Sequence, residues 1–336
     1  MDIRVGIVTA PKIDWERREP KDGERATFVI KNVCIGIGFH WERKEEQEFE
    51  GELEIRRNAD GTETAINTIN IEDYLTSVIS SEMSADCQIE LLKAHAVIAR
   101  SWAIRAMGHH LHEGYDVCAD DHCQRYEGIR RRNERAVEAV RSTAGQVLMY
   151  NGEVCDCRYH KCCGGRTEEY ESCWEDIHVP YLESVDCPYC GRAQAHLEIL
   201  RTILTDYDQE TKDFHDWTAV YRNPGIKELI PLKRGPSGRI YQLKVIGYGL
   251  AENSERVSVI GKELAIRKAL SDSCLYSSNF EVTKDGDAFV LTGHGWGHGV
   301  GLCQIGAAVM AAEGANYQEI LNHYYRHSNL SHRSYK

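Results

Sequence analysis

The sequence lacks the features of a membrane-spanning or nucleic-acid-binding protein. It has no run of about 18 or more apolar residues, whereas a transmembrane helix needs about 20. Positive charge is also scarce, because 40 Lys and Arg residues face 52 Asp and Glu residues, which gives a formal net charge of −12. This balance argues against binding nucleic acid or an anionic membrane through bulk electrostatics. We therefore expect a neutral or cationic partner and no membrane segment.

A recognisable export signal is also missing. The stretch Met1–Trp15 has neither the charged start nor the long apolar core of a secretion signal, so we expect none in the chain as given. No internal repeat or low-complexity tract stands out. The chain has 336 residues, of which 42% are hydrophobic. It is long enough to bury a substantial core in one large or two modest domains.

Hydrophobic patterning predicts an α+β fold. Residues 1–66 show short alternating runs typical of strands, with a hairpin turn at Asn58–Gly61. From Glu72 to Arg105 the pattern becomes helical, with a break near Glu82. Further helices are predicted at Asn133–Thr143, Lys262–Ala269, Gln304–Glu313 and Tyr317–Tyr325. Because strands and helices are segregated, we expect a β-rich region over 1–66 and a second domain over 67–336. We expect that domain to contain a helical segment, metal-braced loops over 109–190 and a C-terminal α/β portion, all forming one cleft.

Cysteines and histidines form the most distinctive pattern. Thirteen cysteines are an odd number, and clusters mixed with histidine favour metal ligation over a disulfide framework. His112, Cys118, His122 and Cys123 could fill a tetrahedral zinc shell, which would make this a structural site without an open position. His109 and His110 are possible substitutes for His112. The alternative is a His-rich helix end followed by unrelated thiols.

A second metal site could involve Cys187 and Cys190, a Cys-x-x-Cys pair that supplies half of a zinc shell. Its partners would come from Cys155, Cys157, Cys162, Cys163 or Cys173. A disulfide between these thiols is the main alternative. A thioredoxin-like role is disfavoured because no βαβ pattern surrounds the pair.

Two features point to a ligand site. A carboxylic acid such as Glu82, at a break between helices and beside apolar neighbours, could stay protonated and donate a proton; the plainer interpretation is an N-cap or surface glutamate. The segment Gly293–Gly301 lacks the Gly-Lys-Ser/Thr ending of a phosphate loop. Its His294, Trp296 and His298 could bind a sugar, or the segment could be a tight structural turn.

Three blocks of the sequence resemble the sporulation stage II protein D (SpoIID/LytB) family. They are INIEDYLTSVISSEM with LLKAHAVIARSWA near Asn67–Arg105, the block Tyr159–Leu182, and GHGWGHGVGLCQIGAAVMAAEG followed by YQEILNHYY. They occur in the family's order and span roughly residues 60–330. Cys303 stands where the family commonly has Ser, and the cysteines of 155–190 are not a general family feature.

The resemblance implies a peptidoglycan lytic transglycosylase that acts on glycan strands, particularly those stripped of stem peptides. It puts Glu82 at the position of the catalytic glutamate and the group around Cys118 where some members bind zinc. The substrate in turn implies a cell-envelope or extracytoplasmic location. We further expect Arg100, Tyr159, His298 and Gln304 to orient the sugar or tune the acid.

Two other function classes are compatible with the sequence. A zinc-dependent hydrolase would use His294 and His298 as ligands, although the sequence has no His-Glu-x-x-His helix. A non-catalytic glycan-binding or amidase-enhancing module is the other class.

Overall fold

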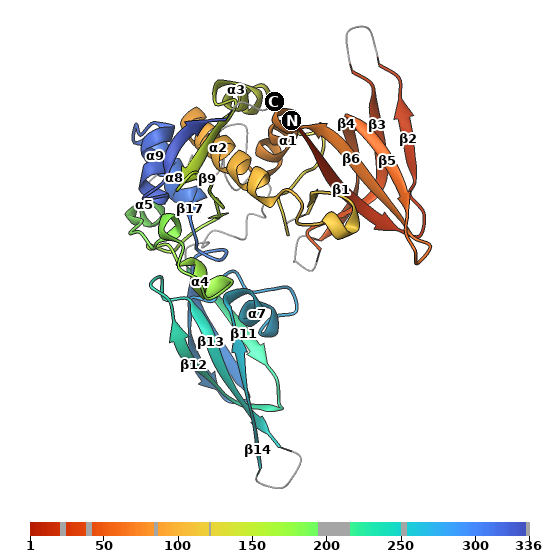
Figure 1. The fold of residues 1–336 in the computed structure, drawn as a ribbon. Helices are drawn as coiled ribbons and strands as arrows, with labels where there is room; N and C mark the ends of the chain where they lie inside the picture. Colours follow the sequence, from red (N-terminus) through yellow and green to blue (C-terminus); the bar gives the residue numbers. More distant parts are fainter. Residues whose placement is uncertain are drawn as a thin grey trace. The chain divides into compact units, whose positions relative to one another are not determined.

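The computed structural model describes residues 1–20, 25–37, 42–83, 87–120, 122–193, 216–249 and 254–333. The chain forms two compact units, which we treat separately (Figure 1). The first comprises Met1–Cys157 and Ser328–Lys336, and the second comprises Arg158–His327. Both contain helices and antiparallel sheets, which confirms the α+β class. The expected boundary between residues 66 and 67 and the expected single cleft stay predictions.

Three sheets build most of the first unit. Its strands are β1 (Asp2–Ala10), β2 (Trp15–Arg18), β3 (Thr27–Ile35), β4 (Arg43–Glu50), β5 (Glu52–Arg57), β6 (Glu63–Asn70), β7 (Val117–Cys118), β8 (Gln146–Tyr150), β9 (Glu153–Val154) and β18 (Asn329–His332). They form sheets of order β5-β6-β1-β7, β2-β3-β4 and β18-β8-β9. The predicted hairpin turn at Asn58–Gly61 joins β5 to β6, where Asn58 N–H bonds to the carbonyl oxygen of Thr62.

The helices of the first unit come after β6, and the first of them follows that strand without a loop. They are α1 (Ile71–Glu82), α2 (Ile89–Ala106), α3 (Glu134–Ser142) and the short 3₁₀ turn η1 (Leu111–Glu113). The side chain of Asn70 caps α1 by accepting a bond from Glu72 N–H, and Asn133 caps α3 in the same way. The predicted apolar face of α1, which includes Tyr74, Leu75 and Val78, is fully buried. Because α1 ends at Glu82 and α2 begins at Ile89, the break predicted near Glu82 is confirmed.

The described residues of the second unit form two three-stranded sheets and one two-stranded sheet. Its strands are β10 (Tyr159–His160), β11 (Asp216–Arg222), β12 (Ile226–Arg234), β13 (Ile240–Tyr248), β14 (Glu255–Gly261), β15 (Phe280–Asp285), β16 (Ala288–His294) and β17 (Leu302–Cys303). They pair in the orders β12-β13-β14, β11-β16-β15 and β10-β17. A core that includes Trp217, Leu243, Ile266, Phe280 and Phe289 fills this part of the unit.

Short helices complete the second unit. They are α4 (Tyr170–Cys173), η2 (Pro180–Leu182), α5 (Pro188–Arg192), α7 (Glu263–Ala269), α8 (Gln304–Ala312) and α9 (Tyr317–Tyr324). α9 begins with a capping box, in which Asn316 and Glu319 satisfy each other's backbone N–H groups. The sequence predicted α7, α8 and α9 to within a residue at each end.

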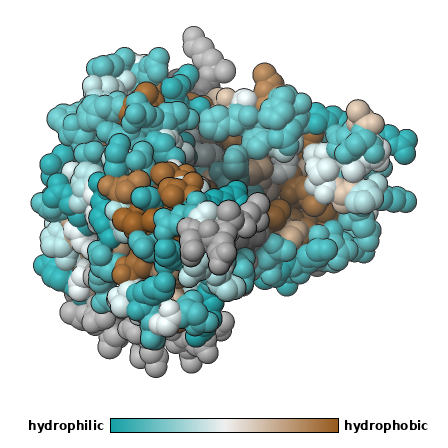
Figure 2. Space-filling view, turned by 90° about the horizontal axis from the view of Figure 1, so that it is seen from below, coloured by the Kyte–Doolittle hydropathy of each residue, from teal (hydrophilic) through white to brown (hydrophobic). Residues whose placement is uncertain are grey.

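Most of the surface visible in Figure 2 is hydrophilic, and hydrophobic patches interrupt it. Exposed hydrophobic side chains include Val257 and Val259 of β14. Within the described residues, every helix is too short or too polar to cross a membrane.

Candidate functional site

Glu82 is the last residue of α1, and its side chain is partly exposed. The chain continues into Met83, which is buried and ends the helix through a bond from its N–H to the carbonyl oxygen of Ile79. The carboxylate therefore projects from a fixed helix end. This is the position that the helical periodicity predicts.

A loop that follows β7 holds the Glu82 carboxylate. The backbone N–H of Arg125 donates to Oε1 of Glu82 at 3.2 Å. The same loop is anchored by bonds from Ala119 N–H to the Gly6 carbonyl and from Tyr126 N–H to the Ala119 carbonyl. Arg125 and Tyr126 are buried, so the donor to Glu82 is part of the packed core.

Two electrostatic effects act on Glu82 in opposite directions. The C-terminal end of a helix carries partial negative charge, which disfavours a carboxylate there by about 0.3–1 kcal/mol. The N–H donor of Arg125, by contrast, favours the charged form. An acid/base catalyst must lose and regain a proton, and the partly exposed Glu82 carboxyl group is accessible for both steps.

Half of the first Cys/His cluster lies on this loop, where Cys123 stands two residues before Arg125. His110, Cys118, His122 and Cys123 have potential ligand atoms that all lie within 4.8 Å of one another. Sγ of Cys123 is 3.4 Å from Nε2 of His110 and 3.6 Å from Nδ1 of His122. The pKa of Cys118 is lowered to about 4, first by the hydrogen bond with Cys123 and then by His122, against the effect of burial. Two thiols and two imidazoles at these distances suit one tetrahedral ion.

A carboxylate orients His110 within this cluster. Nδ1 of His110 is 2.8 Å from Oε1 of Glu113, and the ring stacks on Tyr115 at 5.1 Å between centroids. Glu113 also accepts a bond from the Tyr115 hydroxyl, and these two partners lower its pKa. A carboxylate on Nδ1 leaves Nε2 for a metal, which is the usual second-shell arrangement of a metal-binding histidine.

The structure replaces one predicted member of the cluster. His112 lies on η1 with a side chain that is 77% exposed, and it is not part of the converging group. His110 takes its place because the turn after α2 directs its ring back toward β7. His110 was one of the two substitutes that the sequence allowed; the geometry selects it.

A second cluster lies in the second unit. Cys163, Cys187, Cys190 and Cys303 are buried, and their sulfur atoms lie within 4.8 Å of one another. Cys163 was among the predicted partners of the Cys-x-x-Cys pair, whereas Cys303 was not. All thirteen cysteines fall in the described part of the chain and none of them forms a disulfide, so Cys187 is not joined to Cys190.

Arg100 is buried inside the first unit rather than presented to a ligand. Its guanidinium makes a two-point contact with Glu72, at 3.0 and 2.6 Å. Its other N–H groups bond to the carbonyl oxygens of Ala96, Gln146 and Val140. All five donors are thereby occupied. This geometry makes Arg100 a brace between α1, α2 and β8, in place of the sugar contact expected from the sequence.

Arg100→Met is expected to destabilise the first unit by about 3 kcal/mol, because it leaves Glu72 and buried carbonyl groups without their partner. Because part of the Glu72 side chain is exposed, the loss of stability should lie near the lower end of the range for broken buried ion pairs. The matched control is Arg105→Met, since Arg105 is 56% exposed and its contact with Glu153 is weak, at 4.0 Å. This substitution should lower the free energy of unfolding by at most about 0.5 kcal/mol. Urea unfolding measures both changes, and equal stabilities would contradict the bracing role.

The remaining predicted sugar contacts, Tyr159, His298 and Gln304, belong to the second unit. Gln304 begins α8 and is only 2% exposed, while Tyr159 on β10 is half-buried. Since Glu82 belongs to the first unit, the predicted binding set as a whole stays a prediction.

His298 belongs to an aromatic cluster with His160 and Trp174. Its ring centroid is 5.6 Å from that of His160 and 4.9 Å from that of Trp174. Its Nδ1 accepts a bond from Val300 N–H, so the proton of the neutral ring is on Nε2. Burial lowers the pKa of His298, and it lowers the pKa of His160 to about 3. Both rings are therefore neutral near pH 7.

The ligand set imagined for a zinc-dependent hydrolase does not converge. His294 is exposed at the end of β16 and pairs with Asp216 at 2.5 Å. Among the described residues, no group of three potential ligands includes His294 or His298. The segment Gly293–Gly301 instead pairs through its backbone with another segment, because Trp296 forms an antiparallel β-bridge with Cys162.

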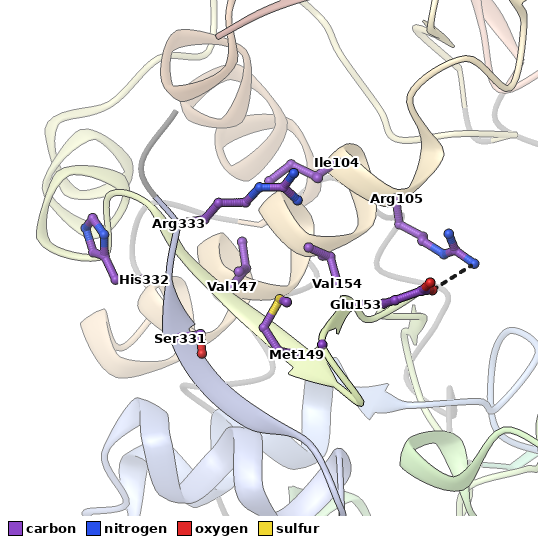
Figure 3. A pocket seen from close by; sticks show the side chains of 10 residues that line it. Ile104, Arg105, Val147, Met149, Glu153, Val154, Ser331, His332 and Arg333 are labelled. Atoms are coloured by element: carbon purple, nitrogen blue, oxygen red, sulfur yellow. Dashed lines mark ion pairs between the residues drawn. The ribbon is translucent and has the colours of Figure 1, made fainter. Parts of the chain in front are cut away.

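A pocket of about 600 Å³ lies elsewhere in the first unit (Figure 3). It is lined by the end of α2, by β8 and β9, and by residues of and after β18. Arg105 and Glu153 face each other across part of it (Figure 3). None of the site residues predicted from the sequence lines this pocket.

Comparison with protein-family models gives two matches. The model described as "Stage II sporulation protein" (SpoIID) matches residues 59–150, the segment that contains Glu82 and the first Cys/His cluster. A model described as a domain of unknown function, DUF8618, matches residues 220–301.

Similar curated proteins cover most of the chain. An uncharacterized protein of Brachyspira hyodysenteriae is 33% identical over 269 residues, which is 79% of this chain and 67% of that protein. Stage II sporulation protein D of Bacillus subtilis is 27% identical over 282 residues, 80% of this chain and 76% of that protein. The Amidase enhancer of Bacillus subtilis is 26% identical over 293 residues, which is 76% of this chain but only 40% of that protein.

Proposed function

The chain belongs to the stage II sporulation protein D family, and we propose that it is a lytic transglycosylase that cleaves peptidoglycan glycan strands between MurNAc and GlcNAc. The names of its relatives, a sporulation protein and an amidase enhancer, support a role at the cell wall. The position of Glu82 carries the proposal. It is a partly exposed carboxyl group at the end of α1, with one oxygen held by the Arg125 N–H.

One carboxyl group suffices for this chemistry. Glu82 gives its proton to the glycosidic oxygen, the bond from that oxygen to C1 of MurNAc breaks, and an oxocarbenium-like species forms. The C6 hydroxyl of the same sugar attacks C1 and returns its proton to the Glu82 carboxylate, which closes a 1,6-anhydro ring. Most glycoside hydrolases need a second carboxylate to activate water or to attack the sugar. An internal nucleophile has a high effective concentration and removes that need.

Two other acids of α1, Glu72 and Asp73, are held in structural contacts. Glu72 is engaged by Arg100, and Asp73 is bonded to Arg25 at 2.9 Å. Both lie in the first turn of α1, at the opposite end of the helix from Glu82. They are helix N-terminal charges with structural partners, as the sequence indicates.

The first cluster would hold zinc as a structural ion. His110, Cys118, His122 and Cys123 fill a tetrahedral shell, which leaves no position for a reacting water. A bound ion there would fasten the loop whose Arg125 N–H contacts Glu82. Its contribution would be to fix the acid in place.

A non-catalytic glycan-binding or amidase-enhancing module is the second candidate. The match to the Amidase enhancer favours it. In that case the protein would bind glycan strands without breaking them. A cell-envelope or extracytoplasmic location follows from either function.

Product analysis separates these possibilities. The protein is incubated with glycan strands stripped of stem peptides and, separately, with intact strands, and the products are identified by mass spectrometry. We expect anhydro-MurNAc ends, formed faster on the stripped strands. Co-sedimentation with unchanged strands would identify a binding module instead, and ordinary reducing ends would identify a hydrolase.

A further inference from the structure

We propose that Cys163, Cys187, Cys190 and Cys303 bind a single zinc ion in a closed structural site of the second unit. The lytic reaction proposed above does not require this site. It is separate from the His110 cluster in composition, since all four ligands are thiols, and it is buried where the other cluster is partly exposed.

The sulfur positions fit one ion. Sγ of Cys163 is 3.4 Å from Sγ of Cys190, and every pair among the four lies within 4.8 Å. Four thiolates around zinc, each about 2.3 Å from the ion, are separated by about 3.8 Å. Tetrahedral sulfur ligation is typical of zinc or of iron–sulfur centres. Sulfurs this close together leave no room for a cluster of several iron atoms.

Neighbouring groups donate hydrogen bonds to the sulfur atoms. The N–H groups of Cys163 and Gly306 each lie 3.3 Å from Sγ of Cys303, which caps the N-terminus of α8. The Tyr324 hydroxyl lies 3.2 Å from Sγ of Cys187. Donors aimed at sulfur stabilise thiolates, and such outer contacts are common around metal ligands. Buried thiolates are costly without a cation, so these cysteines would lose their protons as a positive ion binds among them.

The glycine at position 306 leaves space for the cluster. A Cβ atom there would lie 2.6 Å from Sγ of Cys187, 3.4 Å from Sγ of Cys303 and 2.4 Å from the Tyr324 hydroxyl. No side chain fits beside the four sulfurs. The sequence Cys303-Gln304-Ile305-Gly306 therefore supplies both a ligand and the room around it.

An ion at this position would join three segments that are distant in sequence. Cys163 follows β10, Cys187 and Cys190 belong to the start of α5, and Cys303 links β17 to α8. α5 has only five residues. A helix this short gains little from its own hydrogen bonds. The ion would supply the fixed point at which α5 packs against α8.

Zinc content of the purified protein tests the proposal. With the His110 cluster also loaded, the wild type should carry two zinc ions per chain. Cys163→Ser/Cys190→Ser should carry one, and the control Cys173→Ser, which changes a buried cysteine outside the cluster, should carry two. Two zinc ions per chain in the double variant, as in the control, would overturn the proposal. Iron in place of zinc in the wild type would do the same.

X-ray absorption at the zinc edge tests the same claim on the wild type, independently of whether the variant folds. Two sites with six thiolates and two imidazoles predict an average of three sulfur and one nitrogen ligands per ion. An average of two sulfur and two nitrogen ligands would mean that only the His110 cluster binds zinc. Because neither readout measures activity, both leave the proposed transglycosylase function to be judged separately.

Gly306→Ala is expected to lower the zinc content by about one ion per chain, because the added methyl group would displace Cys187 or Tyr324. Gly261→Ala is the matched control, since a Cβ there meets no atom within 4 Å. Unchanged zinc binding by Gly306→Ala would contradict the geometry proposed for the site.

Discussion

Glu82→Gln is expected to abolish the formation of anhydro ends while the fold and glycan binding remain intact. Gln has nearly the shape of Glu and can still accept the hydrogen bond from Arg125 N–H, but it cannot donate a proton to the glycosidic oxygen. General acid–base catalysis contributes about 100- to 10,000-fold to a rate, and here one group would perform both steps. The turnover of stripped glycan strands, followed by mass spectrometry, measures the loss.

Glu90→Gln is a suitable control for this substitution. Glu90 lies in the first turn of α2, close in sequence to Glu82, and pairs with Lys93 at 2.7 Å. Its replacement should change turnover less than about twofold, because a pair three residues apart on one helix contributes little to stability and Glu90 has no part in the proposed reaction. If Glu82→Gln keeps a substantial fraction of the wild-type rate, Glu82 has no place in the mechanism.

Cys118→Ser/Cys123→Ser is expected to remove one zinc ion per chain and to lower the stability of the first unit. The loss should reach about 3 kcal/mol or more, roughly 10 °C in Tm, because metal binding contributes directly to folding at structural sites. Turnover should fall as well, since the loop after β7 then holds the Glu82 carboxylate less firmly. Elemental analysis and thermal unfolding measure the two effects.

Two histidine variants make this test specific. His110→Ala should lose the same ion, whereas His112→Ala should retain it, because His110 converges on the thiols and His112 is exposed. Zinc retained by His110→Ala and lost by His112→Ala would reverse this assignment. A fully folded protein without metal at this cluster would refute its structural role.

Local patterns allowed the position of Glu82 to be predicted. The helical spacing of apolar residues in α1, its acidic first turn and the gap before α2 all lie within a short stretch of the sequence. Helix ends depend on contacts between residues three or four positions apart, so the sequence of the segment alone can reveal them. The same reason explains why α3, α7, α8 and α9 were predicted closely.

Features that depend on distant contacts could not be predicted. Cys303 lies 140 residues after Cys163 and accepts a hydrogen bond from its N–H. Only the folded chain shows that β10 pairs with β17 and so brings these cysteines together. Spacing alone could not choose between His110 and His112, because the choice depends on the turn after α2. The single signal for His110 was Glu113, a carboxylate three residues away that could orient it.

Arg100 was expected to contact the ligand, but the structure gives it a role inside the fold. An arginine in a block that resembles a catalytic segment suggests a ligand contact, yet all five of its donors are used inside the fold. Glu72, the nearest carboxylate on α1, was interpreted correctly as a helix N-terminal charge, but its partner on α2 was not foreseen. Pairing across helices is a tertiary fact that no single segment contains.

The most direct test of the central claim follows the oxygen atom that ends up on C1 of MurNAc. The wild-type protein is incubated with stripped glycan strands in water enriched in heavy oxygen, and the new ends are examined by mass spectrometry. If Glu82 serves an internal nucleophile, every new MurNAc end is an anhydro ring without the heavy isotope. New reducing ends that carry the heavy isotope would show that water is the nucleophile and would contradict the account.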